Sequence, residues 1–220
     1  MDDGSSFVED ETCVHPLSIS HQFPFVASAR LDTNPTTHHL QVGIDIVMME
    51  PHNAKLYANE EEFINVFSSY FTKWEWSRIH ATEEDKLNEF YIRWAMKEAY
   101  TKAKGMGMSM DFDSFDMRLV NYDNKVDDGI WSHIVPHPKG LYASGSVVFH
   151  PEGPDEAWEF FFLPLLVGNN NSICEEKGNV NGCVCICLGP FPSPSSRFRV
   201  NVQWTSLEQL VQWHCHDVTI

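Results

Sequence analysis

The sequence predicts an α+β domain in which an antiparallel sheet packs against one long central helix. The helix is predicted by residues 90–105, where apolar side chains recur at helical spacing and Gly105 provides a residue that commonly ends a helix. The sheet is predicted by short segments in which apolar and polar residues alternate, two before the helix and several after it. Turn-rich stretches separate the later segments, as expected between neighbouring antiparallel strands.

Length and charge narrow the functional class. The chain has 220 residues, which is enough for one sizeable core or two small lobes. Its formal net charge of −16 argues against a nucleic acid or an anionic membrane as a partner, because both repel an acidic surface. The longest apolar run, residues 160–167, is too short to cross a membrane, and no secretory signal is visible at the start. We therefore expect a cytoplasmic protein with mostly reduced cysteines.

Composition divides the chain into four parts. Residues 1–15 are acidic and are expected to be disordered, and residues 16–167 form the main domain. The polar, Asn-rich residues 168–182 are expected to be a flexible insertion, and residues 183–220 to form a strand, a linker and a short helix.

Two strands are expected before the helix, at residues 25–31 and 41–47, with a loop at 32–39. In the second strand, Val42, Ile44 and Ile46 face one way, and Gly43, Asp45 and Val47 face the other. An acid inside a strand needs a partner, a metal or solvent, so edge exposure and a functional role are both open for Asp45. On the same face, Gly43 would let a ligand or another backbone come close.

A helix is expected at residues 60–70, followed by a capping box. Thr72 is the expected N-cap, Glu75 lies at N3, and Phe71 is placed to pack against Trp76. Glu75 is accordingly interpreted as structural. After the central helix, strands are expected at 112–120, 130–135, 141–149, 157–166 and 183–188, with an edge strand at 197–204 and a helix at 206–213. On the strand at 183–188, Cys183, Cys185 and Cys187 share one face and are interpreted as small buried hydrophobic residues rather than zinc ligands.

The central helix carries the most informative pattern. Trp94, Glu98 and Lys102 are four residues apart, and therefore lie in one line along one face. A carboxylate and an ammonium one turn apart, beside an aromatic ring, can together hold a metal ion and a phosphate. The alternative from spacing alone is a surface Glu–Lys pair.

These patterns combine with others in a fixed order: Ser20-His21-Gln22, then Gly43-Ile44-Asp45, then Phe71-Thr72 with Glu75, then Trp94-Ala95-Met96-Lys97-Glu98 with Lys102 and Gly105. Over residues 16–110 this set resembles the 4′-phosphopantetheinyl transferase superfamily. It is most similar to the Sfp-like branch and, within that branch, to the eukaryotic aminoadipate-semialdehyde-dehydrogenase phosphopantetheinyl transferases, which would connect it with lysine biosynthesis.

The resemblance implies a reaction and its partners. The phosphopantetheine arm of coenzyme A would move to a serine of an acyl-carrier or peptidyl-carrier domain, which is holo-[acyl-carrier-protein] synthase activity. Adenosine 3′,5′-bisphosphate would be released. Mg²⁺ would neutralise the attacked pyrophosphate.

Residue roles follow from the same resemblance. Asp45 and Glu98 match the metal ligands, and Gln22 matches a third ligand position. The family often has an acid at a further position, which is Val47 here. Glu98 would also serve as general base. Lys102 matches a lysine that contacts the phosphates, and Ser18, Ser20 and His21 match the segment that binds the coenzyme A phosphates. Trp94 is expected to be a core and positioning residue.

The resemblance leaves two further expectations. Members of this branch have two similar lobes, and only residues 1–15 precede the Ser-His segment here. We therefore expect mainly the second lobe, with the last strand of the first. Because carrier domains are acidic, Arg93, Lys97, Lys102 and Lys104 are candidates for a local basic patch that binds them. Two alternatives to an active transferase remain at this point: a non-catalytic carrier-binding remnant that lacks the cofactor clamp, and an unrelated acidic α+β interaction protein.

Overall fold

The computed structural model describes residues 16–32, 37–82, 85–119, 129–134, 142–150, 154–166, 180–192, 200–203 and 205. The expectations for residues 1–15 and 206–213, and most of those for 168–182 and 197–204, lie outside these ranges. Within them, no helix is both long enough and apolar enough to cross a membrane.

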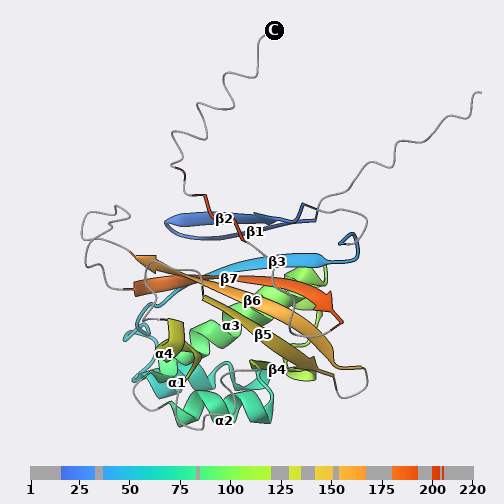
Figure 1. Ribbon diagram of the computed structural model, residues 1–220. Coiled ribbons are helices and arrows are strands. Elements are labelled where there is room, and N and C mark those ends of the chain that lie inside the picture. Colours follow the sequence, from blue (N-terminus) through green and yellow to red (C-terminus); the bar gives the residue numbers. More distant parts are fainter. Residues whose placement is uncertain are drawn as a thin grey trace, which may run out of the picture.

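A five-stranded sheet forms the centre of the molecule (Figure 1). Its strands, in spatial order, are β3 (Gln41–Met48), β7 (Val180–Phe191), β6 (Glu156–Leu166), β5 (Tyr142–Phe149) and β4 (Asp116–Leu119). Every neighbouring pair is antiparallel. The predicted fold class, an antiparallel sheet against a long helix, is confirmed. The last strand in sequence, β7, lies between β3 and β6, so β3 is an edge strand.

The long helix α3 (Lys86–Ala103) packs on β3 and β7. It approaches β3 very closely at Gly43, where an added Cβ would lie 1.9 Å from the carbonyl oxygen of Ala99. The prediction that Gly43 admits a close backbone is confirmed, and that backbone belongs to α3. After α3 the chain turns at Gly105, whose φ of 70° is in the left-handed region that favours glycine.

The main core lies between the sheet and α3. Cys183, Cys185 and Cys187 face this core with fully buried side chains, so their interpretation as small hydrophobic residues is confirmed. On the other face of β3, Val42, Ile44 and Ile46 are buried, and the predicted division of the two faces of this strand is therefore correct.

Below α3 lie the shorter helices α1 (Glu60–Asn65) and α2 (Lys73–Ala81) (Figure 1). The predicted capping box of Thr72 and Glu75 is present, and the ring of Phe71 stacks on Trp76 with centroids 6.2 Å apart. The helix predicted at 60–70 is interrupted, because α1 ends at Asn65 and a 3₁₀ turn, η1 (Ser68–Tyr70), follows.

Two strand predictions are corrected by the structure. Residues 130–134 form a helix, α4 (Ile130–Ile134), instead of a strand. Ile130, Trp131 and Ile134 are buried at helical spacing, and the amide of Trp131 donates to the carboxylate of Glu89 at 3.4 Å, which favours a helix start. The strand predicted at 112–120 is reduced to β4, because residues 112–114 form a 3₁₀ turn, η3 (Phe112–Ser114).

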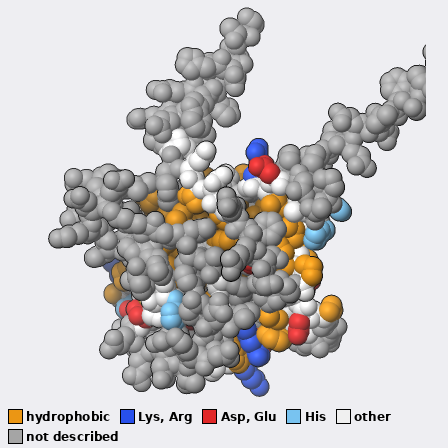
Figure 2. All heavy atoms as spheres, viewed as in Figure 1, with side chains coloured by type: hydrophobic (Ala, Val, Ile, Leu, Met, Phe, Trp, Pro, Cys, Tyr) orange, Lys and Arg blue, Asp and Glu red, His pale blue; other side chains and the backbone are white. Residues whose placement is uncertain are grey.

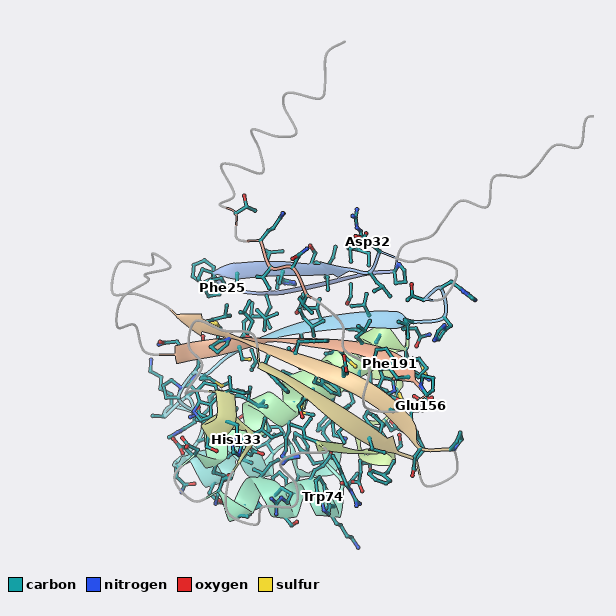
Figure 3. All side chains as sticks on the ribbon, viewed as in Figure 1. Phe25, Asp32, Trp74, His133, Glu156 and Phe191 are labelled. Carbon is teal, nitrogen blue, oxygen red and sulfur yellow. The ribbon has the colours of Figure 1, made fainter. Side chains whose placement is uncertain are left out.

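A separate hairpin, β1 (Leu17–Gln22) with β2 (Phe25–Arg30), covers the free edge of β3 (Figure 1). On β2, Phe25, Ala27 and Ala29 pack against the buried residues of β3 that face away from α3. Figure 3 shows Phe25 on the hairpin and Trp74 on α2 at opposite ends of the molecule, with the sheet and α3 between them.

Candidate active site

The site begins with the way in which β1 is held against β3. Three side chains at every second position of β1 accept hydrogen bonds from the backbone amides of β3. Ser18 Oγ accepts from Ile44 at 3.1 Å, Ser20 Oγ accepts from Ile46 at 3.3 Å, and Gln22 Oε1 accepts from Met48 at 2.9 Å. Side chains thus satisfy the amides that an edge strand would leave open, and they fix the register of β1 beside Asp45.

Asp45 faces α3 and is 7% exposed. Its Oδ1 accepts a hydrogen bond from Ser20 Oγ at 2.9 Å and from Lys102 Nζ at 2.7 Å. Burial raises the pKa of this carboxyl above its usual value of 3.8, although the hydrogen bond and positive charge of Lys102 oppose the shift. The ionised form of this buried carboxyl therefore depends on nearby positive charges for its stability.

Glu98 supplies a second carboxylate, one helical turn before Lys102. Burial, and then the charge of Asp45, raise the pKa of Glu98 above its usual value of 4.5, while Lys102 lowers it. Because each acid would be stabilised by a positive charge between them, the pair is suited to share a cation.

Both acids line one cleft with a volume of about 590 Å³, within the usual range for small-molecule sites. Its polar side is formed by β1, β3 and α3, and its apolar side by aromatic rings. The lining residues are Ile19, Ser20, His21, Gln22, Asp45, Ile46, Val47, Phe63, Phe67, Phe90, Tyr91, Trp94, Glu98 and Lys102. Figure 2 shows hydrophobic side chains at the level of the hairpin and of β3 beneath it.

The cleft brings together six of the seven candidate residues chosen from the sequence: Ser20, His21, Gln22, Asp45, Glu98 and Lys102. The seventh, Ser18, is absent from the lining and is buried at the β3 edge, where its hydroxyl accepts the Ile44 amide. Gln22 reaches the cleft, but its carbonyl oxygen already accepts from Met48. Trp94 lines the cleft in one row with Glu98 and Lys102, as its spacing predicts.

Two residues considered for carrier binding are placed elsewhere. Lys97 is fully buried, with Nζ 2.9 Å from Glu75 and 2.8 Å from the carbonyl oxygen of Phe115. Arg93 is buried in an ion pair with Glu89 at 2.8 Å. The expectation that these cations belong to a basic surface patch is wrong, because each neutralises a buried acid. Glu75 is structural, as predicted.

Sequence reasoning did not assign the aromatic side of the cleft. Phe63, Phe67, Phe90 and Tyr91 line it. Tyr91 is also anchored through its hydroxyl, which donates to the carbonyl oxygen of Glu50 at 2.9 Å. The four-residue spacing between Phe63 and Phe67, and between Phe90 and Trp94, is the sequence pattern from which this aromatic lining could have been predicted.

The donors in the cleft fit a hard divalent cation. They are two carboxylates, Asp45 and Glu98, with the hydroxyl oxygen of Ser20 beside them. Across the described ranges, no cluster of three or more His, Cys, Asp or Glu side chains could hold a metal by itself. Mg²⁺ is commonly bound by one or two carboxylates together with waters and substrate phosphates, whereas zinc requires a fuller set of protein ligands. The site therefore suits Mg²⁺ in the presence of a phosphate ligand.

Comparison with known proteins agrees with this geometry. Residues 41–131 match the family model of the 4′-phosphopantetheinyl transferase superfamily. The chain is 31% identical over 121 residues to 4′-phosphopantetheinyl transferase ffp of Bacillus subtilis, covering 54% of this chain and 46% of that protein. It is 33% identical over 112 residues to the human L-aminoadipate-semialdehyde dehydrogenase-phosphopantetheinyl transferase, covering 49% of this chain and 33% of that protein. It is 32% identical over 104 residues to 4′-phosphopantetheinyl transferase Sfp of Bacillus subtilis strain 168, covering 47% of this chain and 39% of that protein.

These matches span less than half the length of each of these relatives. The matched family region contains Asp45, Glu98 and Lys102, which the fold gathers in one cleft. The chain is therefore similar to the 4′-phosphopantetheinyl transferase superfamily over residues 41–131, which argues against an unrelated protein with a fortuitous pattern.

Proposed function

We propose that this chain transfers the 4′-phosphopantetheine group of coenzyme A to a serine of an acyl-carrier or peptidyl-carrier domain. The observation that carries the proposal is the convergence of Asp45 and Glu98, which are 53 positions apart in the sequence, on one cleft with Lys102. Similarity to the superfamily supports the reaction class, and the oxygen donors support a divalent cation as cofactor.

In the proposed reaction, the carrier serine oxygen attacks the β-phosphorus of the coenzyme A pyrophosphate. A new phosphorus–oxygen bond forms to serine, and the bond to the leaving adenosine 3′,5′-bisphosphate breaks. The serine proton passes to the carboxylate of Glu98, directly or through a water molecule.

The other polar residues bind and orient. Lys102 and His21 line the cleft and would contact the phosphate oxygens, while Ser20 holds Asp45 by donating to its Oδ1. Asp45 and Glu98 would hold Mg²⁺, and Gln22, which lines the same cleft, would be a third oxygen ligand if its Oε1 bound the metal in addition to the Met48 amide. When bound, Mg²⁺ neutralises charge on the diphosphate and thereby makes attack by the serine oxygen easier.

The aromatic side of the cleft fits the pantetheine arm, which is neutral and largely apolar. Phe63, Phe67 and Trp94 offer rings on which its methyl and methylene groups can pack. One cleft would thus hold both the charged end and the apolar arm of the donor.

The test uses the full chain with coenzyme A, Mg²⁺ and an apo acyl-carrier protein, in parallel with an apo peptidyl-carrier domain. Mass spectrometry of the carrier is expected to show the addition of one phosphopantetheine group. Glu98→Gln is expected to abolish the addition while the circular dichroism spectrum stays unchanged. If Glu98→Gln loses helix content, the role of Glu98 is structural.

The same experiment separates transfer from simple carrier binding. If the wild-type chain neither modifies any carrier nor retains coenzyme A, the proposed function is overturned. If it binds an apo carrier without modifying it, the chain is a non-catalytic carrier-binding protein. Lys86→Met is a matched control, because Lys86 lies at the start of α3, pairs with Glu61 at 2.7 Å, and is not among the cleft residues.

A further inference from the structure

Lys102 has a position that is unusual for a residue that only contacts substrate. Its Nζ lies 2.7 Å from Asp45 Oδ1 and 3.2 Å from Ser20 Oγ, and its side chain is 27% exposed. The ammonium is therefore bonded directly to the carboxylate that would bind a metal. With two acids and this one ammonium lining the cleft, the described charges are partly balanced without any bound cation.

A divalent cation and the ammonium compete for the same carboxylate. Asp45 Oδ1 already accepts hydrogen bonds from both Ser20 and Lys102. A metal bound to Asp45 while the ammonium remained 2.7 Å away would meet strong repulsion between positive charges. Lys102 must therefore move away, or the metal must bind weakly.

Lys102 is able to move, and a destination is available. Its side chain is a flexible four-carbon stem near the end of α3, and its ammonium has three donors that suit phosphate oxygens. Ser20 would continue to hold Asp45 through its own hydrogen bond of 2.9 Å, so the carboxylate need not turn when Lys102 leaves.

We propose that Lys102 couples metal binding to diphosphate binding. Without a ligand, Lys102 neutralises Asp45 and keeps the affinity for divalent cations low. When a diphosphate enters the cleft, the ammonium transfers from Asp45 to the phosphate oxygens, and Asp45 becomes free to bind the metal. By linkage, the metal tightens diphosphate binding by the same factor. This inference rests on the proposed function. It adds that the cation and coenzyme A each bind more tightly when the other is present.

The test measures metal binding rather than activity. Mn²⁺ is titrated by calorimetry into the full-length wild type and into Lys102→Met, each with and without coenzyme A. For Mn²⁺ alone, Lys102→Met is expected to bind about tenfold more tightly than the wild type, because the competing ammonium is gone. Coenzyme A is expected to tighten Mn²⁺ binding about tenfold in the wild type and much less in Lys102→Met.

Two controls keep the outcomes separate. Asp45→Asn should remove Mn²⁺ binding under every condition, and Lys86→Met should match the wild type, since Lys86 is not a cleft residue. If the wild type binds Mn²⁺ with coenzyme A, but Lys102→Met binds Mn²⁺ alone no more tightly than the wild type, the coupling role is overturned and the proposed function stands. If no protein binds Mn²⁺ or coenzyme A, the proposed function itself fails.

Discussion

Gly43→Ala tests whether the close packing of α3 on β3 is what aligns the two acids. The added methyl carbon would lie 1.9 Å from the carbonyl oxygen of Ala99 and 2.6 Å from the amide nitrogen of Ala103. Both atoms belong to the helix backbone, which cannot rotate away as a side chain could. Since Cβ atoms essentially never approach closer than 3.0 Å, α3 must retreat by about 1.1 Å, the difference between 3.0 and 1.9 Å.

That displacement has two expected effects. Overpacking a rigid contact typically costs about 1–3 kcal/mol, and we expect Gly43→Ala to lose about 3 kcal/mol of unfolding free energy. The retreat also separates Glu98 on α3 from Asp45 on β3, and a misplacement of about 1 Å can reduce a catalytic rate by about 100-fold. We expect losses of that order in phosphopantetheinyl transfer and a clear weakening of Mn²⁺ binding in the presence of coenzyme A.

Two measurements are needed. Urea unfolding, monitored by fluorescence, gives the stability, and calorimetry with Mn²⁺ at a temperature where the variant is folded gives the metal affinity. Gly189→Ala is the matched control, because its methyl carbon would lie 2.6 Å from the Trp158 ring on the neighbouring strand β6. Gly189 pairs with Gln41 at the far end of β3. Gly189→Ala should therefore lower stability without changing Mn²⁺ affinity. Wild-type stability and Mn²⁺ affinity in Gly43→Ala would refute the reasoning.

Three further predictions concern the scaffold. Lys97→Met should cost about 3–5 kcal/mol of unfolding free energy because it leaves the charge of Glu75 buried and unpaired, and adding Glu75→Gln, which removes that charge but keeps an acceptor, should recover part of this; equal instability of both variants would contradict the ion-pair account. Burial of Glu156 raises the pKa of its carboxyl, but hydrogen bonding and the charge of Lys104 outweigh this and lower the pKa below 4.5. Glu156 therefore stabilises the fold above that pH, and this contribution is lost as the pH falls through the pKa of the folded state. Glu156→Gln should therefore lose less unfolding free energy than the wild type between about pH 6 and about pH 3, and an equal loss would argue against this role. Ser18→Ala should cost about 1–3 kcal/mol by leaving a β3 amide without its acceptor, with Mn²⁺ affinity unchanged; weaker Mn²⁺ binding would instead place Ser18 in the site.

The sequence was sufficient for those features that local spacing determines. Alternation separated the two faces of β3, and the four-residue spacing of Trp94, Glu98 and Lys102 put them in one row along the cleft. The capping box was also predictable, because Thr72 and Glu75 need only local backbone geometry. Gly43 could be identified as a point of close approach, since a glycine beside buried strand positions has few other uses.

The errors occurred where tertiary contacts outweigh local preference. Residues 130–134 are rich in isoleucine and tryptophan and favour a strand, but Glu89 accepts their amide and the buried side chains need helical spacing. Lys97 has the sequence pattern of a surface cation. Its burial is made possible by the ion pair with Glu75, which comes from α2. Neither partner can be inferred from spacing along the chain, because each comes from a separate segment.

Ser20 shows why the hairpin and the site cannot be considered independently. Its hydroxyl accepts the Ile46 amide at 3.3 Å, which helps to close the β3 edge, and donates to Asp45 at 2.9 Å. A single oxygen thus satisfies the fold and orients the carboxylate. Because β1 is held by side chains rather than by a continuous backbone ladder, its separation from β3 would be opposed by few hydrogen bonds. Any event that releases the hairpin would therefore remove the Ser20 hydrogen bond and leave Asp45 held by Lys102, so that the proposed cation site depends on β1 being in place.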